Sequence, residues 1–512
     1  MIRQMEGNHV PPRQIASMLN GTYNSMITMK QIYNETAKIR RERLGGMKPT
    51  KWTIVEATKL GYFTKFTLDE SRRVRNIFIC HPEAVRMVQA WYFVVLIDST
   101  YKTNLYKKVV VRLIGVTPVK KNFNIGLALV EDETKESYAW VLSKLKVVLG
   151  SRLPDAFVTD KERGLGAALA EIFPSSRHLL CIWHMKRNIE ARVTKLTSDR
   201  HVAESFVKGP WGRVLNAATS RGFHAKWNDL VKSGIQQELI DYLTLEWLPC
   251  KLKWARYATN QVFHLGNTST NRVEAAHSSF KTWLHTSVHK LDGVFRAYHR
   301  LMEGQVLEVR KLLEHSRQKT FMIWDPPYGM LNTEVSLWAI QLLDEDRKLV
   351  RSCTCVLRPT KGLPCRHEVQ RCLDAGQLLQ KTHLHRFWAT LDYRSPPDAA
   401  EWEDEATADY DNWRKTVEEI ESQGESAIRD YTRLLQGHLH PEYEDVQDPQ
   451  QAEVPKGRPR RRQNAREPSH FEKVASEADR QKKTGMISFS SNHCYFVILD
   501  VTCLGSPVFY RC

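Results

Sequence analysis

Residues 91–104, WYFVVLIDSTYKTN, contain a run of large apolar side chains that stops abruptly at an acid. The run extends from Trp91 to Ile97 and ends on Asp98, which polar residues follow. Apolar runs of this length with polar boundaries are typical of buried β-strands. The sequence therefore predicts a strand that ends on a carboxylate.

A second segment, DAFVTDKERG, repeats this pattern. Its short apolar run, Ala156–Val158, leads through Thr159 into Asp160. The sequence thus predicts two strands, far apart along the chain, that each end on an acid.

The segments between and after these acids alternate in character. Lys107–Val116 and Phe123–Val130 are rich in β-branched and aromatic residues, which predicts an antiparallel pair of strands. The apolar spacing of Glu136–Val148 predicts an amphipathic helix. Arg163–Ile172 is expected to be a second helix and His178–Ile182 another strand. The predicted order is β-β-β-α-β-α-β.

This order, with DSTYKTN, VTDKERGLGAALAEIFP and HLLCIWHMKRN, closely resembles the transposase domain of Mutator-like elements. The resemblance implies an α/β fold, a ribonuclease H-like DDE transposase core with an all-helical insertion. It assigns the first two catalytic acids to Asp98 and Asp160. TSTNRVEAAHSSFKTWL supplies the third, Glu274, in the family's pattern of Asn or Ser, Arg, any residue, Glu, then a His and a Phe-Lys pair.

Three carboxylates suit the chemistry that this resemblance implies. Transposition cuts and joins phosphodiesters, and two Mg²⁺ (or Mn²⁺) ions about 3.5–4 Å apart can activate the attacking oxygen and stabilise the leaving one. Asp98 is our candidate for the acid that bridges both ions. An aspartate after a strand is more often a turn residue, and a helical glutamate more often lies on a solvated face. Three acids in order, each within a matching local pattern, favour catalysis.

The composition points to a nucleic-acid partner. The 512 residues include 75 Lys and Arg against 58 Asp and Glu, a formal net charge of +17 that favours a polyanion. We expect no secretory signal, because the first residues, MIRQMEGNHVPPRQ, contain no apolar h-region. We also expect no membrane span, because no segment reaches 18 clean apolar residues. The 10 cysteines are then expected in a reducing compartment, such as the nucleus, where they favour metal binding over disulfides.

The CIWH motif places Cys181 and His184 three residues apart at the start of a predicted helix, where both can face one point. Mutator-like and hAT transposases resemble each other in having Cys or Asp, two residues, then His here, a pair thought to help shape the DNA-bound site. A packed cysteine and a hydrogen-bonded histidine are an equal alternative. Neighbouring basic residues are candidates for phosphate contacts: Lys102, Arg163, Lys186, Arg187 and Arg272.

The segment SCTCVLRPTKGLPCRHEVQRC predicts a zinc site. It places Cys353, Cys355, Cys365 and His367 in a C-x-C-x9-C-x-H arrangement. Three thiolates and one imidazole fill a tetrahedral Zn²⁺ shell with no open position, so the zinc is expected to be structural. The arrangement resembles the SWIM zinc finger, which often follows the transposase domain in this family. The finger is basic, and DNA and a second protein are both candidate ligands.

The chain is expected to contain several regions. Two helices near its start, Pro12–Leu19 and Met29–Leu44, fit a helix-turn-helix or, more commonly, a plain helical hairpin. Tryptophans of the insertion are expected mostly in its core, with stacking on unpaired bases as the alternative.

The predicted regions are a helical lead-in with a truncated DNA-binding region at 1–88, the transposase domain at 89–320 with its insertion at about 190–260, the finger at 340–390, a disordered charged tail at 394–485 and an apolar tail of doubtful origin at 486–512.

Charge blocks in the tail bury too little apolar surface to fold. Its basic run, Lys456–Arg466, fits a nuclear localisation signal or a DNA tether as well as a plain solvated linker.

Together these features predict a nuclear DNA transposase. It would cut transposon terminal repeats and join their 3′-hydroxyl ends to target DNA, as a homo-oligomer because two ends must be paired. One alternative is a domesticated, non-catalytic DNA-binding transcriptional regulator, since plant far-red-response transcription factors resemble transposases of this family. Another is a ribonuclease H-like nuclease without strand transfer. The intact set of Asp98, Asp160 and Glu274 favours the transposase.

Overall fold

The computed structural model describes residues 1–7, 10–23, 26–101, 103–284, 289–319, 327–349, 353–394 and 446–450. Most of the predicted charged tail, including Lys456–Arg466, and all of the apolar segment 486–512 lie outside the described residues.

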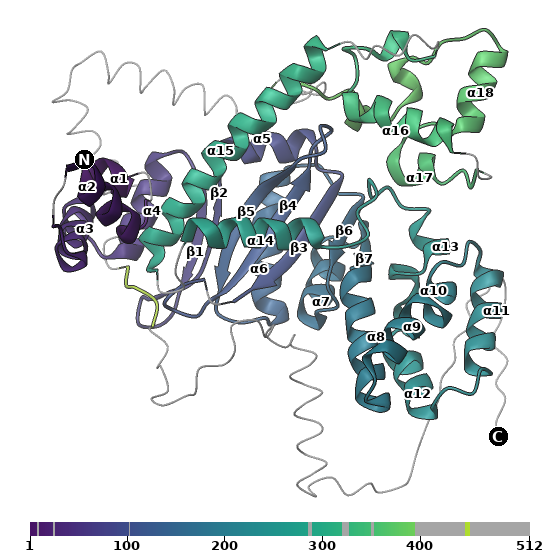
Figure 1. Ribbon diagram of the computed structural model, residues 1–512, viewed down its shortest axis with the longest axis horizontal. Helices are drawn as coiled ribbons and strands as arrows, with labels where there is room; N and C mark the ends of the chain where they lie inside the picture. Colours follow the sequence, from purple (N-terminus) through teal and green to yellow (C-terminus); the bar gives the residue numbers. More distant parts are fainter. Residues whose placement is uncertain are drawn as a thin grey trace, which may run out of the picture. The chain divides into compact units, whose positions relative to one another are not determined.

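Within the described ranges, seven strands form one mixed sheet (Figure 1). In spatial order they are β1 (Phe63–Leu68), β2 (Val74–Cys80), β5 (Asn122–Val130), β4 (Val109–Val116), β3 (Val94–Thr100), β6 (Ala156–Thr159) and β7 (Arg177–Leu180). β6 runs parallel to both β3 and β7, and the other neighbouring strands are antiparallel. The predicted order β-β-β-α-β-α-β is confirmed from β3 to β7.

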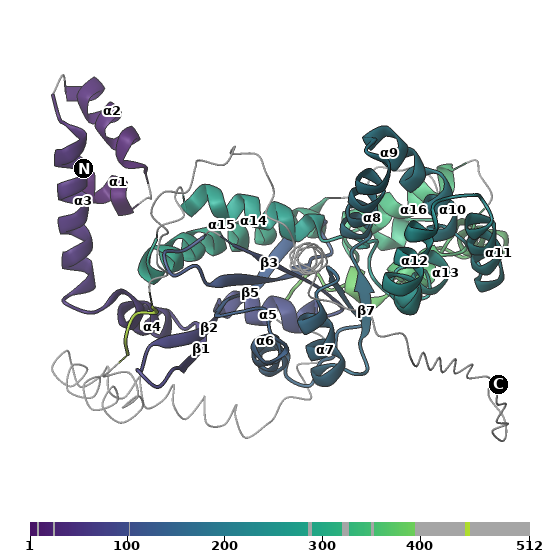
Figure 2. The same ribbon diagram turned by 90° about the horizontal axis from the view of Figure 1, so that it is seen from below.

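Helices cover both faces of the sheet (Figures 1 and 2). α14 (Asn271–Leu284) and α15 (Leu291–Gln318) lie on one face, and α5 (Pro82–Ala90), α6 (Lys135–Leu149) and α7 (Arg163–Ile172) lie on the other. The central strands are therefore buried on both sides, which explains their nearly continuous apolar runs. None of the helices in the described part of the chain is long and apolar enough to cross a membrane.

Two predicted strand boundaries are wrong. β3 begins at Val94 and continues through Asp98 to Thr100, because Asp98 and the two residues after it still pair with β4. Asp98 thus lies within the strand and not after it. β7 ends at Leu180, since Cys181 already caps the next helix with its sulfur atom. Local apolar runs do not reveal such pairing and capping.

The first 88 residues are not helical throughout. Their helices are α1 (Ile2–Gly7), α2 (Pro12–Tyr23), α3 (Met29–Leu44), α4 (Pro49–Lys59) and α5. β1 and β2 also belong to this region, and β2 pairs antiparallel with β5. The sheet therefore begins before residue 89, the expected start of the transposase domain.

The predicted helical insertion has its own core. Its helices are α8 (Ile182–Thr197), α9 (Arg200–Lys208), α10 (Pro210–Leu215), α11 (Ser220–Val231), α12 (Gln237–Glu246), the 3-10 helix η1 (Leu248–Lys253) and α13 (Arg256–Thr259). Trp211, Trp227, Trp247 and Trp254 are all buried in a hydrophobic cluster separate from that of the sheet. The expectation that these tryptophans pack in a core is confirmed.

The segment that contains the predicted finger packs on the start of β3. Its helices are α16 (Leu337–Lys348), α17 (Leu357–Lys361) and α18 (Arg366–Asp374), with short 3-10 helices at Gly329–Leu331, Lys381–His383 and Arg386–Trp388. The indole of Trp91 donates a hydrogen bond of 3.0 Å to the carbonyl of Thr390. The ring of Phe93 lies 4.8 Å from that of His385 and 5.9 Å from that of Phe387. This segment and the sheet therefore share one core.

Candidate active site and metal centre

Asp98 lies on β3, and Asp160 directly follows β6, the neighbouring parallel strand. β3 and β6 pair through Leu96 and Val158, and each acid lies two residues further along the chain. The Asp98 side chain is 9% exposed, and Asp160 is half-buried directly after β6. The sheet thus brings the first two predicted acids to one edge.

Glu274 reaches the same place from the first turn of α14, which packs over β3 and β4. One turn later on this helix, Nδ1 of His277 lies 3.7 Å from Oδ2 of Asp98. Residues three apart on a helix share a face, so Glu274 lies on the side of α14 that faces β3.

The electrostatic environment of Asp98 includes the other two acids. Burial raises the pKa of Asp98 well above its usual value, and the charges of Asp160 and Glu274 raise it further. Among the described residues, the groups of ligand atoms that all lie within 4.8 Å of one another do not include this trio.

Cys181 and His184 converge on Thr270, the residue just before α14. The sulfur of Cys181 accepts hydrogen bonds from the Thr270 backbone N–H (3.2 Å) and hydroxyl (3.3 Å). The hydroxyl oxygen of Thr270 also lies 3.2 Å from Nδ1 of His184. Nε2 of His184 lies 3.4 Å from Oε1 of Glu274. The motif therefore joins the start of the insertion to the helix of the third acid.

A fourth acid, Glu133, lies near this site and was missed by the sequence analysis. Its carboxylate accepts hydrogen bonds from the hydroxyls of Tyr101 and Tyr138, and Ser99 on β3 contacts Tyr138 at 3.0 Å. Glu133 also contributes to the raised pKa of Asp98, after burial and the other two acids. The signal was present, since the apolar run of β5 ends on Glu131, Asp132 and Glu133.

Gly164 allows the loop that carries Glu133 to approach α7. A Cβ at Gly164 would lie 2.6 Å from the carbonyl oxygen of Glu133, whereas a Cβ at Gly166 would meet only the His178 ring at 3.6 Å. We therefore expect Gly164→Ala to lower the free energy of unfolding by about 1–3 kcal/mol through overpacking. Gly166→Ala, the matched control in the same helix, should be neutral or stabilising by up to about 1 kcal/mol.

Urea unfolding of the two glycine variants measures this difference. Equal stabilities for Gly164→Ala and Gly166→Ala would contradict a close approach between the loop and α7.

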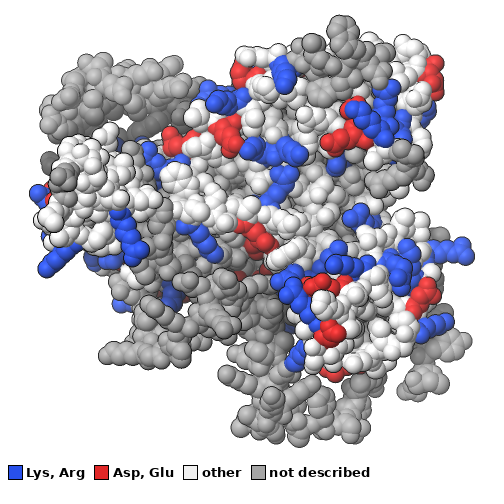
Figure 3. Space-filling view, viewed as in Figure 1, with Lys and Arg blue, Asp and Glu red and all other residues white. Residues whose placement is uncertain are grey.

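The basic residues predicted to contact phosphate have different surroundings. Lys102 lies outside the described residues. Arg163 on α7 and Arg187 on α8 are exposed, and Lys186 is half-buried. Arg272 donates hydrogen bonds to the turn between β4 and β5. Lys and Arg side chains also gather over α8–α13, with acidic side chains among them (Figure 3).

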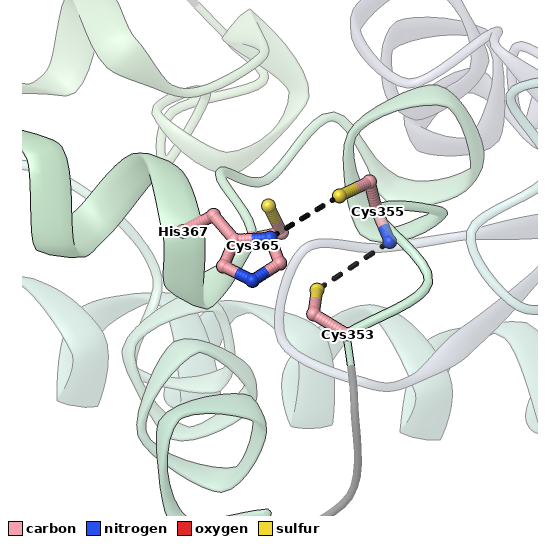
Figure 4. Close-up of side chains that lie close together, drawn as sticks. All are labelled: Cys353, Cys355, Cys365 and His367. Carbon is pink, nitrogen blue, oxygen red and sulfur yellow. Dashed lines mark hydrogen bonds between the residues drawn. The ribbon is translucent and has the colours of Figure 1, made fainter.

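The four predicted zinc ligands come together (Figure 4). The ligand atoms of Cys353, Cys355, Cys365 and His367 all lie within 4.8 Å of one another. The sulfur of Cys355 lies 3.4 Å from Nδ1 of His367, and the Cys355 backbone N–H donates to the Cys353 sulfur at 3.4 Å. Three thiols and an imidazole in this proximity fit a tetrahedral zinc ion.

A second group of potential metal ligands comprises His81, His299 and Glu303, whose ligand atoms also lie within 4.8 Å of one another. Hydrogen bonds account for the arrangement of these side chains. Nδ1 of His81 accepts a 3.0 Å hydrogen bond from the backbone N–H of Glu83. The proton of neutral His81 is therefore on Nε2, 3.4 Å from Oε1 of Glu303. A ring nitrogen that carries a proton has no lone pair for a metal, so this group fits a hydrogen-bonded cluster.

Comparisons with known proteins give one family model and several curated relatives. The family model described as "MULE transposase domain" matches residues 94–188. The protein FAR-RED IMPAIRED RESPONSE 1 of Arabidopsis thaliana is 25% identical over 252 residues, covering 48% of this chain and 29% of that protein. Protein FAR1-RELATED SEQUENCE 5 of the same plant is 23% identical over 262 residues, covering 49% and 31%.

A third relative matches a larger share of this chain. The PKS-NRPS hybrid synthetase cheA of Chaetomium globosum is 22% identical over 444 residues, which cover 74% of this chain and 9% of that protein. The chain thus spans less than a third of the length of each of these relatives.

Proposed function

We propose that this protein is a DNA transposase acting in the nucleus, because residues 94–188 match the family model of the MULE transposase domain. It cuts transposon terminal repeats and joins the 3′-hydroxyl ends to target DNA. The core is assigned to the ribonuclease H-like class, with Asp98, Asp160 and Glu274 as its catalytic acids. The observation that carries the proposal is the buried carboxylate of Asp98, with the other two acids close enough to raise its pKa.

The three carboxylates are suitable ligands for hard divalent cations. Oxygen ligands are the ones that Mg²⁺ and Mn²⁺ prefer, and clustered carboxylates repel one another unless cations lie between them. When bound, two such ions would activate the attacking oxygen and stabilise the leaving oxygen. We assign Asp98 as the ligand that both ions would share, because it is the most buried of the three acids and its strand lies between β4 and β6.

The remaining residues of the site orient these acids and the DNA. Cys181, Thr270 and His184 hold the start of α14 and thereby Glu274. Arg163, Lys186 and Arg187 are placed for contacts with phosphate, which fix the position of DNA without reading its sequence. The assignment of Lys102 and Arg272 to the same role rests on their position in the motifs. Two transposon ends would be paired by a homo-oligomer.

The Cys353–His367 segment is assigned as a SWIM zinc finger with one structural Zn²⁺. The donor set supports zinc because thiolates and imidazole are its usual ligands. The ion would stabilise the segment that supports the start of β3, and DNA or a second protein would bind its basic exterior.

A second candidate function is a non-catalytic DNA-binding transcriptional regulator derived from such a transposase. The similarity to FAR-RED IMPAIRED RESPONSE 1 and several related Arabidopsis proteins favours it. The three clustered acids favour the transposase, because a protein that only binds DNA has no need of them.

An assay on purified full-length protein separates these functions. The substrate is labelled duplex DNA that carries the inverted repeats flanking the gene, incubated with plasmid target and Mg²⁺ or Mn²⁺. A transposase yields joined products, a nuclease yields cleaved ends without joining, and a regulator yields bound but intact DNA. Binding without metal-dependent cleavage would overturn the proposed activity.

Thr270→Val tests how Glu274 is held. The variant keeps the side-chain shape but removes the hydroxyl that contacts Cys181 and His184. We expect the free energy of unfolding to fall by about 1–2 kcal/mol and DNA cleavage to slow. Thr282→Val, at an exposed position of α14, should change stability by less than about 0.5 kcal/mol. Equal behaviour of the two variants in chemical unfolding and cleavage assays would refute the role of Thr270.

A further inference from the structure

Arg112 connects the strand next to Asp98 with the helix of Glu274. On β4 it lies directly opposite Asp98 of β3, and it is 0% exposed. Its Nη1 donates a hydrogen bond of 3.3 Å to the backbone carbonyl of Ala276 on α14. Its guanidinium carbon lies 5.0 Å from the centre of the Phe280 ring, one turn further along that helix. A single side chain thus binds two turns of α14 to the sheet.

Packing alone does not explain an arginine at this position. Its Nε and Nη2 atoms have no hydrogen-bond partner among the described residues. Burial lowers the pKa of Arg112 only to about 10, so the side chain is charged at neutral pH. A buried cation without a paired acid is costly, and an apolar side chain of similar volume would often be as stable or more stable.

The position of α14 matters because the helix carries two groups of the site. Glu274 lies two residues before Ala276, and His277 lies one residue after it, with Nδ1 3.7 Å from Oδ2 of Asp98. A shift of α14 along β4 would move both Glu274 and His277 relative to Asp98. Metal sites are sensitive to such shifts, because the groups that orient ligands strongly influence metal affinity.

We propose that Arg112 is a positioning residue of the metal site, which fixes α14 against β4 and so sets the spacing between Glu274 and Asp98. This inference rests on the proposed function, since it requires that these acids bind divalent ions. Arg112 itself touches neither substrate nor metal.

Mn²⁺ binding to the full-length, zinc-loaded protein, followed by electron paramagnetic resonance, tests this role. We expect Arg112→Met to raise the Mn²⁺ dissociation constant by about 10- to 100-fold while its melting temperature stays at or above that of the wild type. Arg112→Lys keeps a donor and a charge, so it should restore part of the affinity.

Two further variants serve as controls. Val141→Ala opens a cavity at a buried position of α6 on the opposite face of the sheet. It should lower the melting temperature and leave the Mn²⁺ dissociation constant within about twofold of the wild type, because metal affinity depends on the groups that orient the ligands. Asp98→Asn should abolish this binding.

The outcomes separate the inference from the proposed function. If Asp98→Asn loses Mn²⁺ while Arg112→Met binds it like the wild type, the role of Arg112 is refuted and the metal site stands. If Asp98→Asn binds Mn²⁺ normally, both proposals fail. Should Arg112→Met prove unstable, hydrogen exchange in Arg112→Lys is compared with that of the wild type. A larger increase in exchange rate along α14 than along α15 supports the positioning role, and equal increases in the two helices contradict it.

Discussion

Asp98→Asn is expected to abolish DNA cleavage and joining while the folded protein becomes as stable as the wild type or more stable. The amide has nearly the shape of the carboxylate but cannot supply its charge to a metal ion. A loss of about 4 kcal/mol of transition-state stabilisation lowers the rate by about 10³-fold.

The opposite effect on stability follows from the pKa of Asp98. Burial, Asp160 and Glu274 all raise this pKa, so ionisation of Asp98 destabilises the folded state. The stability that the protonated group contributes is lost as the pH rises through its folded-state pKa. The free energy of unfolding of Asp98→Asn should therefore exceed that of the wild type by a small amount near pH 4 and by the largest amount at neutral pH.

Urea unfolding at both pH values, without added Mg²⁺, and the joining assay measure these effects. Asp229→Asn, an acid-to-amide change on the exposed side of α11, is the control and should change stability by less than about 0.5 kcal/mol and retain activity. Joining by Asp98→Asn would contradict the transposase assignment. Loss of stability at neutral pH would contradict the repulsion among the three acids.

Loss of the zinc ion is expected to destabilise the sheet as well as the finger. Zinc binding to small fingers contributes about 10–16 kcal/mol, and the segment that the ion would hold contacts Trp91 and Phe93, which lie just before β3. We expect Cys365→Ser to lose the zinc and to lower the free energy of unfolding by about 3 kcal/mol or more. Faster hydrogen exchange in β3 should accompany this loss.

Cys372→Ser is the matched control for the zinc experiment. Cys372 is a half-buried cysteine on α18, the helix that Cys365 caps, but it is not among the four clustered ligands. Atomic absorption should find about one zinc per chain in this variant and in the wild type. A Cys365→Ser protein that lacks zinc but keeps β3 protected would show that the finger folds independently of the sheet.

Local patterns in the sequence predicted the centre of the fold well. The strands that carry Asp98 and Asp160 have apolar runs that stop at polar residues, and both were located within a few residues. The β-branched and aromatic residues of β5 and the apolar spacing of α6 were equally informative. These elements are determined by burial, which hydrophobic periodicity records directly.

Contacts between distant segments could not be predicted in this way. The pairing of β2 with β5 joins two strands that lie on either side of β3 and β4 in the sequence. Arg112 appeared as one more residue of a strand, because its role depends on a helix more than 150 residues later. The role of Glu133 was missed although acids follow β5, since its link to β3 depends on hydrogen bonds from the hydroxyls of Tyr101 and Tyr138.

The hydrogen bond between Trp91 and Thr390 has a consequence for the newborn polypeptide. The two residues are separated by 299 positions, which a ribosome adding about 5–20 residues per second needs about 15–60 s to cover. Throughout that interval Trp91 and Phe93, just before β3, lack the segment that covers them and expose aromatic surface. A nascent chain of this protein is therefore expected to bind chaperones at this aromatic surface until residue 390 has been synthesised.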